Sequence, residues 1–177
     1  MLIVNLFGGP GCGKSTGAAY VFTRLKEAGV NCELVTEFAK DLVWDGRKDE
    51  LADQVLVFAV QRHRLNRLRG KVDVVVTDSP LLLSAVYYRD GQDIDEEFGA
   101  LVTKSHFENP SLNVFVKRAK PYQKAGRNES EAEAKEKDNE IRYLFEKFLK
   151  GERRMTVDGM STGYEEVVQK VLKEVKR

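Results

Sequence analysis

The chain has 177 residues, of which 42% are hydrophobic and 32% are charged, and its formal net charge is +1. This length suits one domain with a sizeable core, and the charge excludes a globally basic protein that attracts nucleic acid by its overall field. Two cysteines without ligand-like spacing and two histidines predict neither a disulfide framework nor a His-rich metal site. No signal-peptide pattern or membrane-spanning apolar stretch is present, so we expect a cytoplasmic protein.

Taken in chain order, apolar runs alternate with stretches of helical periodicity. Strands are predicted at residues 2–7, 31–36, 72–78, 112–118 and 153–159, where the sequence is short, apolar and rich in β-branched residues. Helices are predicted at 14–28, 37–46, 50–69, 81–88 and 96–105, in a segment that ends near residue 150, and at 164–176. This alternation predicts an α/β fold, a single domain over residues 1–177 whose five-stranded parallel sheet is covered by helices on both faces.

The stretch FGGPGCGKST separates the first predicted strand from the first predicted helix. Gly8, Gly13, Lys14 and Ser15 fit G-x-x-x-x-G-K-[ST], the phosphate-binding P-loop of NTPases. Glycines let backbone N–H groups converge on an anion, and the helix that follows adds the positive end of its dipole. We expect Lys14 to reach the β- and γ-phosphates and Ser15 to ligate Mg²⁺. The expected nucleotide-binding residues are Gly8, Gly9, Pro10, Gly11, Cys12, Gly13, Lys14, Ser15 and Thr16.

A carboxylate at the end of a neighbouring strand is the second part of such a site. The run VVVTD ends in Asp78, which we expect to ligate or orient the Mg²⁺ directly or through water. An ordinary turn at DSP is the alternative interpretation. Together with the P-loop, Asp78 predicts an ATP-dependent enzyme.

A polar, charged segment at residues 118–138 is predicted to be a lid. It carries Arg118, Lys120, Lys124 and Arg127 within ten residues. Guanidinium groups that close over the phosphates stabilise transition-state charge and exclude water, and Arg118 and Arg127 are the best candidates. The alternative is a solvated loop that leads into a helix.

Two further pairs of residues are candidates for binding the acceptor. Glu37 and Asp41 lie one helical turn apart at the end of the second strand, where a parallel sheet presents its ligand crevice. A carboxylate there can accept a hydroxyl proton, although a helix dipole alone would also favour it. Arg64 and Arg67 share a helix face that can meet an acceptor phosphate or a DNA backbone, or can simply be a solvated helix end.

Four segments together resemble a group of small P-loop kinases encoded by bacterial viruses: GGPGCGKST, VTEFAKDL, TDSPLLLS and KPYQKAGRNESEAEAKEKD. The resemblance covers nearly the whole chain and extends to thymidylate kinase and nicotinamide riboside kinase. It implies a five-stranded parallel core, with the Asp78 strand beside the P-loop strand and a lid after the fourth strand.

The closest activity that this resemblance suggests is the 5-hydroxymethyluracil DNA kinase. Such an enzyme phosphorylates the hydroxymethyl group of the modified base in viral DNA, a step towards hypermodified thymidine that protects the DNA from host restriction. Carried over by position, the P-loop binds ATP, Asp78 serves magnesium, and Arg118 and Arg127 act in the lid. Glu37 is then the acceptor-side carboxylate.

Three alternatives share the P-loop and differ in what accepts the phosphate. A deoxynucleoside monophosphate kinase needs no general base and would clamp its acceptor with an arginine pair such as Arg64 and Arg67. A nucleoside-type kinase, for example on nicotinamide riboside, needs the base but no DNA. A non-catalytic ATP-dependent switch binds nucleotide and yields no phosphorylated product.

Overall fold

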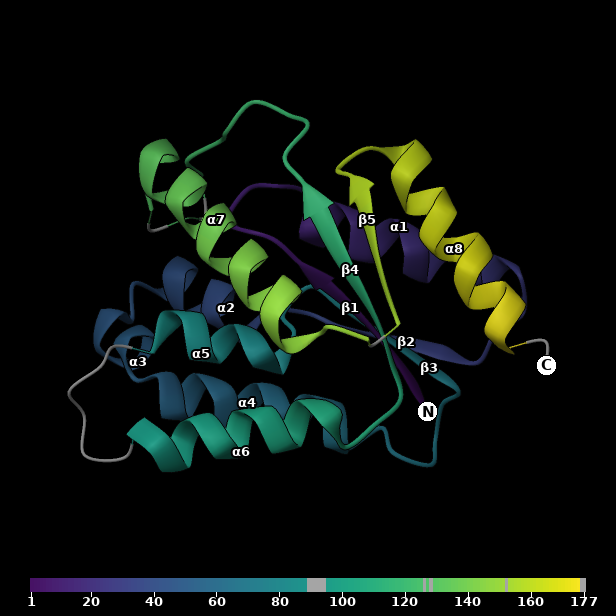
Figure 1. Ribbon diagram of the computed structural model, residues 1–177, viewed down its shortest axis with the longest axis horizontal. Helices are drawn as coiled ribbons and strands as arrows, with labels where there is room; N and C mark the ends of the chain where they lie inside the picture. The colour runs from purple at the N-terminus through teal and green to yellow at the C-terminus, as the bar shows by residue number, and fades with distance from the viewer. Residues whose placement is uncertain (89–94, 126, 128, 152, 176–177) are drawn as a thin grey trace.

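The fold is described from a computed structural model, which covers residues 1–88, 95–125, 127, 129–151 and 153–175. Five strands form one parallel sheet in the order β2–β3–β1–β4–β5 (Figure 1). The predicted five-stranded parallel sheet is therefore confirmed, and β3, which leads into Asp78, lies beside β1, which leads into the P-loop. The strands are β1 Leu2–Phe7, β2 Cys32–Val35, β3 Val74–Thr77, β4 Ser111–Lys117 and β5 Arg154–Asp158.

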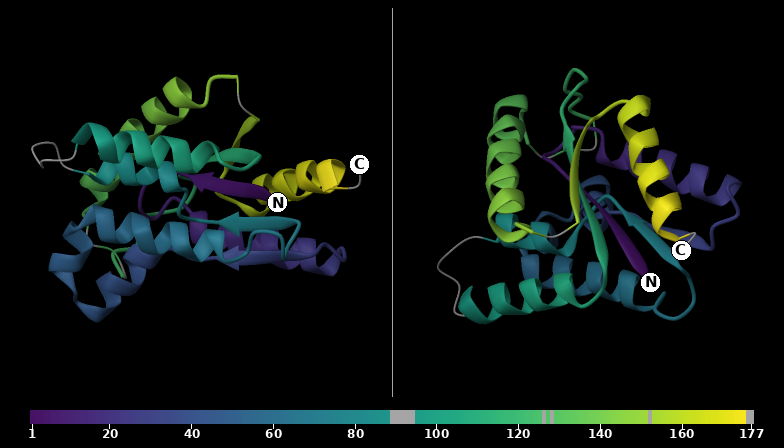
Figure 2. Two further views of the ribbon diagram at one scale, coloured as in Figure 1. Left: turned by 90° about the horizontal axis from the view of Figure 1, so that it is seen from below. Right: turned by 45° about the vertical axis from the view of Figure 1, so that its right-hand side comes forward.

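Helices cover both faces of this sheet (Figures 1 and 2). One face packs against α1 and α8, and the other against α4, α6 and α7. The helices are α1 Lys14–Glu27, α2 Phe38–Asp45, α3 Lys48–Ala52, α4 Gln54–Asn66, the 3₁₀ turn η1 Leu81–Leu83, α5 Ser84–Tyr87, α6 Asp95–Phe107, α7 Glu131–Phe148 and α8 Ser161–Val175. The predicted helix at 164–176 runs past Val175 into residues outside the described part of the chain.

The strand sequences explain how two separate cores form. Side chains alternate across a strand, so Val4 and Leu6 pack towards α1 and α8, while Phe7 packs towards α7. In β3, Val75 points to the opposite face of the sheet from Val74 and Val76. Because both faces are covered, the central strands are mostly apolar, and the buried Asn5 of β1 donates a hydrogen bond to Asn113 of β4 at 3.1 Å.

The helix predicted over residues 50–69 is wrong. The chain breaks at Asp53, whose backbone (φ −77°, ψ 89°) is not helical, and two helices, α3 and α4, result. The Asp53 carboxylate accepts a hydrogen bond from the Leu56 N–H at 3.0 Å and so caps α4. An aspartate that satisfies a free N–H at a helix start stabilises the break. The helix predicted at 81–88 likewise opens as the 3₁₀ turn η1 before α5.

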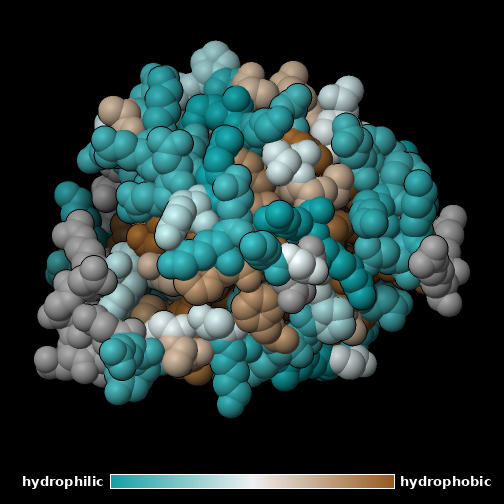
Figure 3. All heavy atoms as spheres, in the orientation of Figure 1, coloured by the Kyte–Doolittle hydropathy of each residue, from teal (hydrophilic) through white to brown (hydrophobic). Residues whose placement is uncertain are grey.

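The segment after β4 leaves the carboxyl end of the sheet, arches over it and returns as α7 (Figure 1). A capping box starts α7, in which Ser130 and Glu133 bond each other's backbone N–H groups. On the face that Figure 3 shows, hydrophilic side chains predominate and hydrophobic ones are visible in the gaps between them. None of the helices in the described residues has the length and apolar character needed to cross a membrane.

Candidate functional site

The P-loop wraps around its own lysine. Gly13 has a φ of +112°, a left-handed conformation that side-chain-bearing residues rarely adopt, and α1 starts directly after it at Lys14. The Lys14 ammonium donates hydrogen bonds to the carbonyl oxygens of Gly8 at 2.7 Å and Gly9 at 3.0 Å. The lysine side chain is buried. The positive charge therefore lies within the loop, at the start of a helix whose dipole adds to it.

From one side, α8 supports this loop through Tyr164. The buried Tyr164 hydroxyl donates a hydrogen bond to the Gly13 carbonyl at 2.9 Å. Burial raises the pKa of Tyr164 to about 12, so the hydroxyl keeps its proton. The Tyr164 ring also lies against Gly17, where a Cβ would stand 2.5 Å from a ring carbon. Nothing in the sequence distinguishes Tyr164, because an aromatic residue in an amphipathic helix carries no signal for this contact.

From the other side, two residues of the predicted lid hold the loop. Asp138 accepts a hydrogen bond from the Gly9 N–H at 2.8 Å and pairs with the Arg118 Nε at 2.9 Å. Arg118 also donates through Nη2 to the Pro10 carbonyl at 2.8 Å. Its Nη1 is buried and has no hydrogen-bond partner among the described residues. Arg118 thus lies against the loop itself, and its contact with a phosphate stays a prediction. Asp138 was not singled out from the sequence.

The second predicted lid arginine faces the cleft. Arg127 stacks over the ring of Tyr122, with 5.6 Å between the guanidinium carbon and the ring centroid. Both side chains lie against Gly11, where a Cβ would be 3.1 Å from the Arg127 Nε. Arg127 and Tyr122 therefore lie against the P-loop, and the role of the segment as a lid stays a prediction. Residues 126 and 128 of the predicted lid lie outside the described residues.

The predicted magnesium ligands fit that ion. Asp78 is 2% exposed, and its Oδ1 is buried without a hydrogen-bond partner among the described residues. Ser15 is exposed and lines the cleft. Mg²⁺ takes few protein oxygens and keeps waters and phosphate oxygens. A hydroxyl at the start of α1 and a carboxylate with a free oxygen are a suitable donor set.

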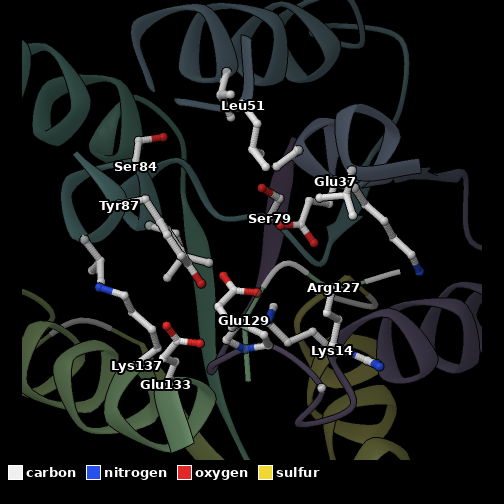
Figure 4. A pocket seen from close by; sticks show the side chains of 18 of the residues that line it. Lys14, Glu37, Leu51, Ser79, Ser84, Tyr87, Arg127, Glu129, Glu133 and Lys137 are labelled. Carbon is white, nitrogen blue, oxygen red and sulfur yellow. The ribbon is translucent and has the colours of Figure 1, made fainter. Parts of the chain in front are cut away.

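A cleft of about 1080 Å³ opens beside the P-loop (Figure 4). Glu37 lines it from the end of β2 and start of α2, and its side chain makes no capping hydrogen bond to that helix. Burial raises the pKa of Glu37, the carboxylates of Asp78 and Glu129 raise it further, and Lys14 opposes them. A carboxylate with a raised pKa beside a phosphate-binding loop is a stronger proton acceptor than an ordinary one.

The two walls of the cleft differ in charge. The wall formed by α7 and by Glu129 just before it is acidic, and Lys137 in this wall pairs with Glu140 at 2.6 Å. These acidic residues are Glu129, Glu133, Glu136 and Glu140. The opposite wall, from α2 to α4, is mainly apolar and carries two lysines, Lys40 and Lys48. Tyr87 also lines the cleft, and burial raises its pKa far above the usual value, so it stays neutral.

Three of the predicted acceptor residues lie elsewhere. Asp41, Arg64 and Arg67 line a separate depression of about 340 Å³. Arg64 pairs with Asp41 at 2.8 Å and stacks over the Phe38 ring, 5.2 Å from its centroid. Arg67 is exposed at the end of α4. The structure therefore brings Glu37 to the P-loop and leaves the other three residues outside the cleft.

Comparison with protein families gives a match over most of the chain. The sequence profile of a protein family described as an AAA domain matches residues 3–166. The matched region starts in β1, contains the P-loop, Asp78, Glu37 and the segment that follows β4, and ends in α8. No curated protein matches the chain.

Proposed function

The chain belongs to the AAA domain family, with a P-loop nucleotide-binding site, and we propose that it is an ATP-dependent kinase acting on a hydroxyl group. One observation carries this proposal: the Glu37 carboxylate, whose pKa is raised by burial, and the P-loop lysine Lys14 line the same cleft of about 1080 Å³ (Figure 4). A switch that only binds nucleotide has no use for such a base, and neither does a kinase whose acceptor is already an anion.

The mechanism assigns one task to each group. Lys14 and the loop N–H groups bind the β- and γ-phosphates, and Ser15 and Asp78 would hold Mg²⁺. When bound, that ion neutralises phosphate charge. Glu37 accepts the proton of the acceptor hydroxyl while its oxygen bonds to the γ-phosphorus. The bond from phosphorus to the β,γ-bridging oxygen breaks, and ADP leaves with the electron pair.

Arg127 completes the site from the lid side. Its stacking on Tyr122 beside Gly11 places a guanidinium at the mouth of the loop. From there it balances charge on the transferring group and, with the lid, keeps water from competing with the acceptor. We propose that this exclusion of water makes the protein a kinase in preference to an ATPase.

For the acceptor, we propose the hydroxymethyl group of 5-hydroxymethyluracil in viral DNA, flipped out of the stack into the cleft. The resemblance of the P-loop, TEFAKDL and TDSPLLL segments to viral kinases supports it, and so does the position of Glu37. Such a step would serve DNA modification against host restriction. A nucleoside acceptor would use the same chemistry.

The charge of the cleft disfavours the monophosphate kinase. That acceptor needs a cationic clamp, yet Arg127 is the one arginine among the described residues that line the cleft. The wall along α7 is acidic and would repel a second phosphate. Arg64 and Arg67, which would form the clamp, lie in the other depression.

The test offers γ-labelled ATP with three sets of acceptors. These are duplex DNA that contains 5-hydroxymethyluracil, the same duplex with thymine as a matched control, and a panel of free nucleosides and monophosphates. Label on the modified duplex alone supports the full proposal. If a free nucleoside is labelled, the protein is still a kinase that acts on a hydroxyl group, but its acceptor is the nucleoside. Nucleotide binding without any labelled product overturns the kinase.

A further inference from the structure

We infer that Asp138 is a positioning residue that couples α7, whose first turns belong to the predicted lid, to the phosphate-binding loop. The inference rests on the proposed binding of ATP by that loop. Asp138 is not a P-loop residue and need not touch substrate. It acts on the backbone that does.

Asp138 engages two groups that are far apart in the sequence. Its Oδ1 accepts the Gly9 N–H at 2.8 Å, and its Oδ2 accepts the Arg118 Nε–H at 2.9 Å. The side chains of Asp138 and Arg118 are only 17% and 13% exposed. Charge-assisted hydrogen bonds shielded from water are stronger and more directional than neutral ones on the surface.

Arg118 closes the connection on the loop. It donates to the Pro10 carbonyl at 2.8 Å, so one ion pair fixes an N–H and a carbonyl on consecutive residues of the loop. The Gly9 N–H belongs to the Gly8–Gly9 peptide and the Pro10 carbonyl to the Pro10–Gly11 peptide, so fixing both groups sets the orientation of the two peptide planes on either side of the Gly9–Pro10 bond. These planes set the direction in which the chain enters the rest of the loop, where N–H groups must converge on the phosphates.

Gly9 shows how closely the loop and α7 approach. A Cβ at Gly9 would stand 2.4 Å from the Asp138 carboxylate and 2.8 Å from the Ala134 carbonyl. No side chain fits there, so α7 cannot move closer to this part of the loop without displacing it. The glycine is needed for this close approach, since its φ is not in the left-handed region.

The preceding residue of α7, Lys137, gives the coupling its functional consequence. Lys137 lines the cleft together with Glu133, whereas Asp138 holds the loop (Figure 4). A single helix thus carries both an acceptor-facing surface and the contact that orients the triphosphate site. Because coupling between two sites is reciprocal, an acceptor that moves α7 should change ATP affinity, and ATP should change acceptor affinity.

The experiment measures the affinity of the full chain for ATP and for AMP, by competition with a fluorescent ATP analogue. In Asp138→Asn, which keeps an acceptor for Gly9 but loses the charge facing Arg118, we expect ATP affinity to fall about tenfold. AMP lacks the β- and γ-phosphates and should lose less than about twofold. Glu146→Gln makes the same charge change on the exposed side of α7 and should alter neither affinity.

A second comparison separates positioning from folding. Arg118→Lys cannot reach both the Asp138 carboxylate and Pro10, and we expect a similar loss of ATP affinity. The double variant should lose no more than the more affected single variant, because both act through one connection. Equal losses for ATP and AMP, or an unchanged ATP affinity in Asp138→Asn, would overturn the inference. Wild-type protein that binds ATP and labels no acceptor would overturn the kinase and leave this result standing.

Discussion

The cleft has two halves: the triphosphate half, which the P-loop forms, and the proposed acceptor half, which faces it. The two halves are built in opposite ways. The triphosphate half uses consecutive residues, from Gly8 to Thr16, and presents mostly backbone. The acceptor half collects side chains from α2, α5 and α7, such as Glu37, Tyr87 and Glu133. A backbone site can be encoded in one short motif, whereas a side-chain site depends on the tertiary fold.

The two halves also differ in how they are held. The P-loop is fixed from both sides, by Tyr164 of α8 and by the Arg118–Asp138 pair at α7. Glu37 has no capping hydrogen bond to its helix, and its raised pKa is due first to burial. The P-loop backbone is thus held in place by neighbouring side chains, whereas Glu37 lacks a capping hydrogen bond of this kind.

Removing the P-loop ammonium should give the largest effect. In Lys14→Ala, we expect phosphoryl transfer to fall by about 10³-fold or more, because the charge that stabilises the transferring group is lost. Steady-state rates with labelled ATP measure it, and circular dichroism checks that the fold is kept. Lys26→Ala, an exposed lysine of the same helix, is the control. Unchanged turnover in Lys14→Ala would refute the assignment of the triphosphate half.

Removing the proposed base tests the acceptor half. In Glu37→Gln, transfer to a hydroxyl acceptor should fall on the order of 10²-fold, while transfer to a phosphate acceptor should change little. Asp45→Asn, an exposed carboxylate of α2, should leave both rates intact. Full activity of Glu37→Gln on an alcohol would remove Glu37 as the base.

The pH dependence of kcat/KM is a second test of the role of Glu37. Glu37 is a base only when ionised, and its pKa lies above the ordinary 4.5. As the pH falls through this raised pKa, the carboxylate gains a proton and kcat/KM should decline. The decline should thus occur at a higher pH than for an ordinary glutamate, and Glu37→Gln should lack it. An identical acidic limb in the variant would assign that limb to another group.

The contrast between the halves also explains what the sequence could predict. The P-loop and the parallel sheet follow from local patterns: apolar strands, helical periods and glycines at fixed offsets. The break at Asp53 was also local, an N-cap that the regular apolar spacing concealed. These features need no knowledge of residues distant in the chain.

The residues that complete the site needed the fold. Asp138 meets Gly9 across 129 positions, and Tyr164 meets Gly13 across 151. Nothing local distinguishes Asp138 from its charged neighbours on α7. The spacing of Glu37 and Asp41 suggested one shared site, yet Asp41 pairs with Arg64 outside the cleft. A pattern along one helix does not fix which side faces the ligand.

Removing one hydroxyl behind the triphosphate half should have a smaller effect. Tyr164→Phe deletes a single hydrogen bond to the Gly13 carbonyl, so we expect a loss of about 1 kcal/mol, or about fivefold in ATP affinity. Competition binding measures it. Tyr20→Phe is the matched control, since its hydroxyl bonds to Glu165 and not to the loop. Equal losses in both variants would mean that Tyr164 contributes only packing.

The smallest effect is expected from Arg67→Ala, which tests whether bound DNA also contacts the protein outside the cleft. Four arginines lie at the end of α4 and just after it. Arg62 and Arg69 pair with Glu108, and Arg64 pairs with Asp41, so Arg67 is the one of the four without an ion pair among the described residues. Arg67 lines the smaller depression, which lies apart from the cleft. If a DNA duplex crosses that depression, Arg67→Ala should weaken DNA binding about threefold and reduce the slope of log affinity against log salt by about 0.9. Lys173→Ala on α8 should leave the slope unchanged. An unaltered slope in Arg67→Ala would confine the acceptor to the cleft, where only Glu37 and its neighbours could select it.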